Sequence, residues 1–377
     1  MGGTDAGHSG GAREVKLQGK AKNKGSSCPY DKGQTARLSQ GKVNYRLEGP
    51  AGAPIVVCLH GLNANLSSFM YLGPLLVEEG FRVLTFDFYG FGLSSSPLGK
   101  RDASFYAKQL LDLLDFIWQQ ENDPPTAMPP VHIVGYCLGG LVATEFALQY
   151  PQRIARLLLV APCGFVSRKQ APCQPLLFGC LRQPCRGAFF LGLVSCLAWC
   201  CQCPVRFYLR GKELDAMSPD VRDPDSEFCK AAARRNTNRY AWSFPRSLIS
   251  CLRGLRDMPI WREDFHETYA RLAETKVPVL FLWGDDDGVV ALDEAREALT
   301  SLFAPKQRSC IVLEGAGHGL IGDSEDVPEV ASCAASWFRD AQSPSWLKRL
   351  RGSRIGAEAN EENNPSSFVE RVLNNIL

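Results

Sequence analysis

Short apolar segments alternate with longer segments of helical periodicity along most of this chain, and this alternation restricts the possible folds more than any other feature. Residues 54–59 (PIVVCL) form a continuously apolar segment between turn residues, as expected of a strand covered on both faces. Residues 104–120 carry apolar residues at helical spacing, with Ser104 as the expected N-cap. Strands that alternate with helices form βαβ units. The sequence therefore predicts an α/β fold with a mainly parallel sheet flanked by helices on both faces.

The expected elements divide the chain into a core and an insertion. We expect strands at residues 42–47, 54–59, 82–86, 131–134, 155–160, 278–283 and 310–313, and helices at 66–79, 104–120, 138–150, 292–302 and 327–338. Residues 165–276 interrupt the alternation, which resumes afterwards. We interpret them as an inserted, mostly helical cap, and residues 37–164 and 277–340 as the core.

Both ends of the chain differ in composition from this core. Residues 1–36 are rich in glycine, serine and lysine and have few large apolar side chains, so they bury too little surface to offset the entropy of ordering. We expect a disordered N-terminal tail there. Residues 341–377 have mixed charge and are expected to form a loosely held C-terminal tail.

The segment GYCLGG, residues 135–140, lies directly between an expected strand and an expected helix. A nucleophile on such a sharp turn has strained backbone, and only small residues two positions away on either side avoid a clash. Here these residues are Gly135 and Gly139, and the residue at the turn is Cys137. A thiol at a helix N-terminus beside a histidine loses its proton readily. Cys137 is the expected nucleophile; the alternative is a small buried residue in an inactive site.

This elbow resembles that of the α/β-hydrolase fold superfamily, in which serine is usual at the turn. The other motifs follow in the order that the superfamily shows: His60-Gly61-Leu62 after the first long strand, residues 87–94 (DFYGFGLS) after the next, then residues 284–287 (GDDD) and Gly317-His318-Gly319. The resemblance extends over about residues 43–340 and is greatest to capped lipases and esterases.

The resemblance implies a catalytic triad and an oxyanion hole. Cys137, Asp287 and His318 occur in the chain order of nucleophile, acid and histidine that this fold uses. Asp287 would orient the histidine, with Asp285 and Asp286 as alternatives in the same acidic run.

The oxyanion hole would consist of backbone N–H groups, so the side chains at these positions are free to vary. The resemblance assigns this role to Leu62 and Leu138. The elbow and the oxyanion loop would be supported by His60, Gly61, Gly135 and Gly139. His60 is interpreted as a residue that shapes the loop rather than one that carries a proton.

Cysteine in place of serine leaves the acyl acceptor open. Dienelactone hydrolase uses a Cys-His-Asp triad and has a similar GYCLGG-like stretch, but this similarity covers six residues only. The predicted function is hydrolysis of a carboxylic ester or thioester of a lipophilic acyl substrate through a covalent acyl-enzyme. One alternative is acyl transfer to an alcohol or amine by the same triad. Another is a fold without activity that binds a hydrophobic ligand or a partner.

The most apolar stretch, residues 187–203, lies in the insertion. A membrane crossing there contradicts the fold, because strands before and after the insertion belong to one sheet. Two interpretations remain: a helix that covers a hydrophobic pocket, or a surface that enters one leaflet and gives peripheral membrane contact. Cys196, Cys200 and Cys203 recur on one face of this stretch, where packing or acylation accounts for them.

Composition bears on cofactors, partners and compartment. With 42 basic and 40 acidic residues, the net charge of +2 gives no field that favours nucleic acid, so we expect no nucleic-acid partner. Residues 228–262 hold a local basic excess, interpreted as a solvated helix face or a contact for anionic headgroups or a charged substrate. The irregular cysteine spacing argues against zinc, and we expect no metal and no cofactor. Free thiols and the lack of an apolar signal segment predict a cytoplasmic protein.

Overall fold

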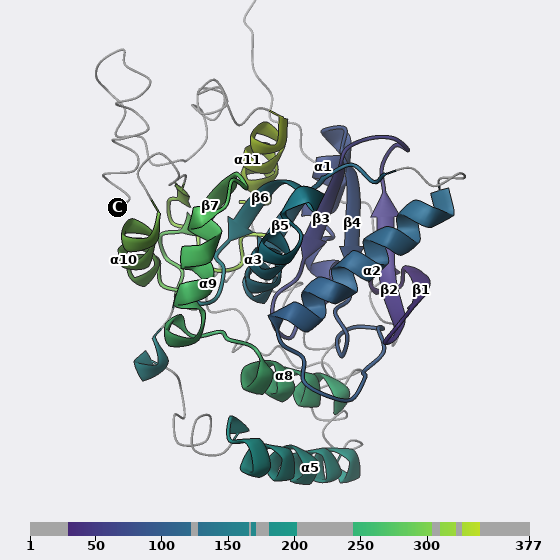
Figure 1. Ribbon diagram of the computed structural model, residues 1–377, viewed down its shortest axis with the longest axis vertical. Helices are drawn as coiled ribbons and strands as arrows, with labels where there is room; N and C mark the ends of the chain where they lie inside the picture. The colour runs from purple at the N-terminus through teal and green to yellow at the C-terminus, as the bar shows by residue number, and fades with distance from the viewer. Residues whose placement is uncertain are drawn as a thin grey trace, which may run out of the picture.

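The computed structural model describes residues 29–121, 127–165, 167–170, 181–201, 244–303, 310–321 and 326–339. The described residues build an eight-stranded sheet with the order β1-β2-β4-β3-β5-β6-β7-β8 (Figure 1). The strands are β1 (Gln34–Leu38), β2 (Gly41–Glu48), β3 (Ile55–Leu59), β4 (Arg82–Phe86), β5 (Val131–Tyr136), β6 (Ile154–Val160), β7 (Val279–Gly284) and β8 (Cys310–Leu313).

The sheet is parallel apart from its first two strands. β2 pairs antiparallel with both β1 and β4, whereas all pairs from β4 through β3 to β8 are parallel. Every residue of β3 and of β7 is buried, because helices cover both faces of the sheet. The predicted α/β fold is confirmed, and the carboxyl ends of the parallel strands meet at one edge.

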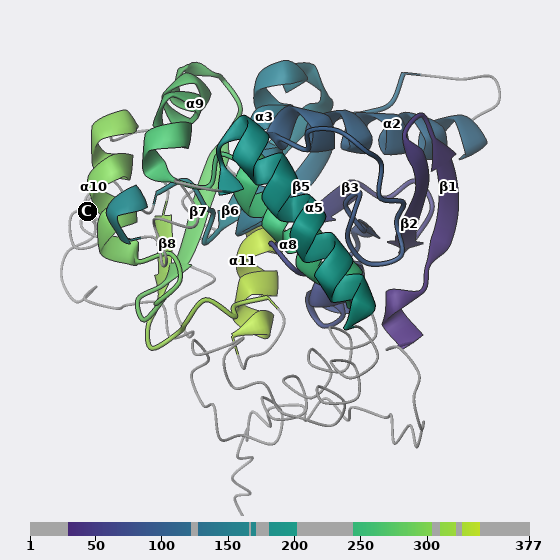
Figure 2. The same cartoon turned by 90° about the horizontal axis from the view of Figure 1, so that it is seen from below.

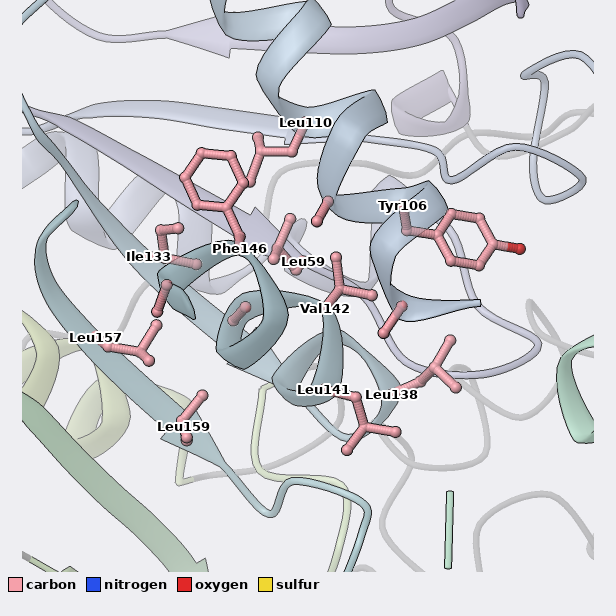
Figure 3. Packing of buried hydrophobic residues seen from close by; sticks show 14 of the residues in the cluster. Leu59, Tyr106, Leu110, Ile133, Leu138, Leu141, Val142, Phe146, Leu157 and Leu159 are labelled. Carbon is pink, nitrogen blue, oxygen red and sulfur yellow. The ribbon is translucent and has the colours of Figure 1, made fainter. Parts of the chain in front are cut away.

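Helices form one layer on each side of the sheet. The described helices are α1 (Leu72–Glu78), α2 (Ala103–Glu121), α3 (Leu138–Gln149), α5 (Pro184–Cys200), α8 (Arg246–Asp257), α9 (Arg262–Glu274), α10 (Leu292–Leu302) and α11 (Val327–Arg339). α2, α3 and α9 lie on one side and α11 on the other (Figure 2). Leu141, Val142 and Phe146 of α3 pack with Leu59 and Ile133 of the sheet (Figure 3). This packing fixes the start of α3 beside the ends of β3 and β5.

Three local expectations were wrong. The cap of α2 is Asp102 rather than Ser104: its Oδ1 accepts the Phe105 N–H at 3.0 Å, and the helix begins one residue earlier. Residues 66–79 do not form one helix, because Pro74 lacks an N–H and is tolerated only in a first turn. A short 3₁₀ turn, Leu66–Phe69, therefore precedes α1.

Ordered structure also begins earlier than residue 37. A 3₁₀ turn at Pro29–Asp31 and strand β1 lie within the expected tail. The amide of Asn44 donates to the backbone oxygen of Asp31, and the amide of Asn65 donates to its carboxylate, both at 2.9 Å. These hydrogen bonds fix the segment around Asp31 against the core, although it has little apolar surface to bury. Residues 1–28 and the expected C-terminal tail lie outside the described residues.

The segment between β6 and β7 contains helices with two different placements. α9 packs against α3 within the layer that covers the sheet. α8 instead contacts the loops that follow β3 and β4, and α5 packs on α8 as the outermost helix (Figures 1 and 2). Most of the expected cap, residues 202–243, lies outside the described residues. The described part nevertheless places α8 over the carboxyl edge of the sheet.

Candidate active site

Cys137 occupies the turn between β5 and α3 in a strained conformation. Its φ of 52° and ψ of −116° lie where L-residues are rare. A methyl group at Gly139 would lie 2.1 Å from the carbonyl oxygen of Leu59, and one at Gly135 would lie 2.8 Å from the Gly139 oxygen. Only glycine fits at both positions, which explains the pattern around Cys137. Cys137 as a whole residue is 8% exposed, and it lies at the carboxyl edge of the sheet.

The loops after β7 and β8 bring a carboxylate and an imidazole together. The Nδ1 atom of His318 lies 2.9 Å from Oδ2 of Asp287. The other oxygen of Asp287 accepts the N–H groups of Val289 and Val290 at 2.9 and 2.7 Å, so the carboxylate is fixed. Asp285 turns elsewhere and accepts the N–H of Gly315. The backbone N–H of Asp286 donates to the Ala316 oxygen, and among the three aspartates of this run Asp287 is the one whose carboxylate contacts the imidazole.

His318 and Cys137 act on each other electrostatically: the imidazole lowers the pKa of the thiol, and the thiolate raises the pKa of the imidazole. Because Nδ1 faces Asp287, Nε2 is the ring nitrogen left for the sulfur. The aromatic ring of Tyr136 lies 5.1 Å from the imidazole, and its hydroxyl donates to the backbone oxygen of His318 at 3.0 Å. The structure thus brings Cys137, Asp287 and His318 into one linked group.

The charges of this group favour a thiolate beside an imidazolium. A hydrogen bond from Cys163, the positive charge of His318 and the N–H of Leu138 hold the pKa of Cys137 well below its ordinary value, against the effect of burial. Burial opposes the charged form of His318, but the Cys137 thiolate and Asp287 outweigh it and raise the pKa of the imidazole to about 10. A thiolate is the reactive form of cysteine.

The loop after β3 lies directly against this group. A methyl group at Gly61 would lie 3.2 Å from Cβ of Cys137, so the backbone approaches the thiol closely. The His60 ring is held between the backbone oxygen of Gly61, at 2.8 Å, and the Phe88 N–H, at 3.1 Å. His60 thus has backbone partners on both ring nitrogens and shapes the loop that carries Leu62.

Asp87, the first residue of the 87–94 motif, stabilises the loop that follows β3. The Asp87 carboxylate is fully buried and accepts the N–H groups of Leu66 and Leu93 and the amide of Asn44. Burial raises the pKa of Asp87 to about 6, although these hydrogen bonds act in the opposite direction. A methyl group at Gly92 would lie 2.1 Å from the carboxylate. Asp87 therefore ties together the loops after β3 and β4.

Comparison with known proteins agrees with this architecture. A family model described as the α/β hydrolase fold matches residues 54–179. An esterase from Exiguobacterium antarcticum superposes with a TM-score of 0.57 at 20% identity, covering 82% of this chain and all of that one. The chain has the α/β-hydrolase fold. At this identity the structural similarity describes the fold alone.

Curated relatives match the chain over shorter segments. A putative 2-succinyl-6-hydroxy-2,4-cyclohexadiene-1-carboxylate synthase of Bacillus subtilis is 34% identical over 113 residues, which cover 30% of this chain and 38% of the relative. A 1-acylglycerol-3-phosphate O-acyltransferase of Sus scrofa is 31% identical over 145 residues, 37% of this chain and 39% of the relative. The match thus spans about two fifths of these relatives' length.

One residue of the candidate site was not predicted. Cys163 follows β6, and its sulfur lies 3.3 Å from the sulfur of Cys137. Predicting Cys163 would have required the order of the strands in the sheet. β6 lies next to β5, so the residues that follow these two strands meet at the same edge. The other predicted residues, Leu62, Leu138, His60, Gly61, Gly135 and Gly139, all line the turns around Cys137.

The described residues also bear on membrane spanning and metal binding. Among those residues no helix is both long and apolar enough to span a bilayer, and no group of three or more metal-ligating side chains is arranged to hold an ion. The nine cysteines whose side chains the structure describes are free thiols. Cys203 and the basic residues between positions 228 and 243 lie outside the described part.

Proposed function

We propose that this α/β-hydrolase cleaves a carboxylic ester or thioester of a lipophilic acyl group, with Cys137 as nucleophile, His318 as acid and base, and Asp287 as the residue that orients His318. The observation that carries the proposal is the 2.9 Å hydrogen bond between the Asp287 carboxylate and His318, whose imidazole lowers the pKa of the Cys137 thiol. The low pKa of Cys137 means that the thiolate exists before substrate binds. The turn between β5 and α3 places that thiolate at the carboxyl edge of the sheet.

In the first half of the reaction, the Cys137 thiolate attacks the acyl carbonyl carbon and the carbonyl electrons move to oxygen. The N–H groups of Leu62 and Leu138 stabilise this oxyanion, a contribution of about 3 kcal/mol for one donor. The intermediate collapses to a thioester on Cys137. The leaving alkoxide or thiolate takes the proton from Nε2 of His318 and departs as alcohol or thiol.

In the second half, water replaces the leaving group. His318 removes one proton from water, and the resulting hydroxide attacks the thioester carbonyl. The carbon–sulfur bond breaks, which releases the carboxylic acid and restores the thiolate and the imidazolium. Asp287 stabilises the charged imidazole in both halves, because its Oδ2 accepts the Nδ1 proton.

The lipophilic character of the substrate is inferred from the helices next to the site. A methyl group at Gly254 of α8 would lie 2.6 Å from Cδ1 of Leu62, so α8 borders the oxyanion loop. α5 packs on α8 and is apolar from position 187 to its end at Cys200. An apolar helix stacked on the helix that borders the oxyanion loop suits an acyl chain better than a charged substrate.

We also propose that α5 contacts a membrane surface from which such substrates come. Phe189, Leu193 and Leu197 recur every fourth residue and are 76%, 49% and 55% exposed, and Trp199 beside them is 55% exposed. Large apolar side chains that gather on one helix and face solvent are typical of interfacial helices. The partner is a lipid surface, and the location is cytoplasmic with peripheral membrane contact.

Acyl transfer is the second candidate reaction. It is supported by the acyltransferase named among the relatives and by the reactivity of a thioester toward nucleophiles other than water. An alcohol or amine would then take the place of water in the second half-reaction. The ratio of acid to transfer product, measured with and without added acceptor, distinguishes the two.

The test of the proposed reaction is a panel of esters and thioesters of increasing acyl length, run on the wild type and on Cys137→Ala. The proposal expects turnover that rises with acyl length and is lost in the variant. Turnover by neither protein, together with ordinary reactivity of Cys137 toward iodoacetamide, would instead support a fold that only binds a hydrophobic ligand or partner.

A further inference from the structure

Two sulfur atoms meet in the candidate active site. Sγ of Cys163 lies 3.3 Å from Sγ of Cys137, and the two thiols share a hydrogen bond. The proposed acyl chemistry uses only one of them. Because the Cys163 proton lies on this hydrogen bond, and because the site is buried, the pKa of Cys163 is raised well above its ordinary value. Cys137 is thus the thiolate and Cys163 the neutral thiol of the pair.

The backbone holds these two residues beside each other. The Cys163 N–H donates to the Cys137 oxygen at 3.1 Å, and the Cys137 N–H donates to the Val160 oxygen at 3.0 Å. The Tyr269 hydroxyl of α9 donates to the Cys163 oxygen at 2.7 Å. A disulfide needs the sulfurs to close to about 2.05 Å, a shift of roughly 1.2 Å that side-chain rotation can supply between adjacent backbones.

We propose that Cys137 and Cys163 form a peroxide-responsive modification site, in which Cys137 is oxidised first and Cys163 closes a disulfide onto it. The Cys137 thiolate attacks one oxygen of hydrogen peroxide, the oxygen–oxygen bond breaks, and Cys137 becomes a sulfenic acid while hydroxide leaves. Cys163 sulfur then attacks the Cys137 sulfur, its proton passes to the departing hydroxyl, and water is released. Peroxide is the oxidant and the two thiols are oxidised.

The geometry accounts for the selectivity of this site. Cys137 carries a thiolate beside His318, whereas burial raises the pKa values of Cys58, Cys310 and Cys333 in the sheet and α11. Burial raises the pKa of Cys251, on α8, to about 11, so this thiol is a poor nucleophile at neutral pH. A neighbouring thiol also protects the first oxidation product, because disulfide closure competes with irreversible oxidation to sulfinic acid.

The consequence for activity rests on the proposed function, but the bond itself does not. If Cys137 is the nucleophile, the disulfide removes it from turnover, and a thiol reductant restores it. The cross-link can be measured by mass even in a chain without activity. The two proposals therefore fail separately.

The experiment treats the full chain with hydrogen peroxide and maps the products by intact mass and peptide analysis. We expect a loss of two hydrogen atoms and a Cys137–Cys163 cross-linked peptide in the wild type, reversed by dithiothreitol. Hydrolysis of a long-chain ester falls in proportion to the cross-linked fraction. Cys163→Ser should instead add two oxygen atoms at Cys137, without recovery by dithiothreitol. Cys163→Ala serves the same purpose if the serine variant does not fold.

Cys251→Ser is the matched control, because it removes another half-buried thiol and should leave the cross-link between Cys137 and Cys163 intact. A wild-type chain that accumulates sulfinic acid at Cys137 without the cross-link contradicts the proposal. A cross-link that joins any other pair of cysteines also contradicts it. A cross-link that forms without loss of ester hydrolysis keeps the modification site and overturns the proposed catalytic role of Cys137.

Discussion

The imidazole of His318 is held from one side by Asp287, whose Oδ2 lies 2.9 Å from Nδ1. The carboxylate is fully buried and its second oxygen accepts two backbone N–H groups, so it cannot turn away. This contact fixes which ring nitrogen faces Cys137. It also stabilises the positive charge on the ring, and the reaction proposed for this fold depends on both effects.

Asp287→Asn should lower kcat by about 10³- to 10⁴-fold for an ester substrate, with little change in folding. The amide keeps an oxygen for the N–H groups of Val289 and Val290 but presents an N–H to the imidazole, which selects the wrong tautomer. Steady-state hydrolysis measures the change in kcat, and a thermal unfolding curve measures the change in folding stability. Asp285→Asn is the control and should keep most of the activity. Equal loss in the two variants contradicts the assignment of Asp287.

The pH dependence of the reaction should differ from that of a serine triad. The pKa of Cys137 is held well below its ordinary value, so the acid limb of activity should lie well below the pH at which a free thiol titrates. The raised pKa of His318, about 10, means that the acid for the leaving group is lost as the pH rises through that range. The measurement is kcat/KM against pH. An acid limb near the ordinary thiol pKa of about 8.5 contradicts this charge state.

Much of the site follows from the sequence because each residue stands at the end of a recognisable strand. Cys137, Asp287 and His318 each follow an apolar strand, and parallel strands carry their carboxyl ends to one edge. Cys163 was missed because nothing local in the chain shows that β6 lies next to β5. Asp102 replaced Ser104 as the cap of α2 because competing polar residues only two positions apart differ only in their final geometry. The contacts of α8 likewise depend on tertiary packing.

Gly139→Ala should destabilise the fold and distort the turn that carries Cys137. The added methyl group would lie 2.1 Å from the Leu59 oxygen, so the strand or the helix must shift, at a cost of about 3 kcal/mol. Urea unfolding measures the free energy of unfolding. Gly192→Ala in α5 is the matched control: no atom lies within 4 Å of its added methyl group, and helix propensity gains about 1 kcal/mol. A neutral Gly139→Ala contradicts the packing described.

The exposed side chains of α5 should contribute to vesicle binding. Phe189→Ser combined with Leu197→Ser removes apolar surface worth about 2 kcal/mol, so the partition constant measured by sedimentation with phospholipid vesicles should fall by roughly thirtyfold. Phe189→Leu is the control that keeps an apolar side chain and should bind nearly as the wild type does. Unchanged binding of the double variant would mean that lipid contact, if present, does not involve α5.

The most direct test of the central claim is the mass of the protein after rapid mixing with a long-chain p-nitrophenyl ester and acid quenching. We predict one acyl group bound as a thioester, mapped to the peptide that contains Cys137, formed as fast as the burst of p-nitrophenol. Cys137→Ala should show neither the adduct nor the burst. Turnover by Cys137→Ala at the wild-type rate, or an acyl group found on another residue, would contradict the account.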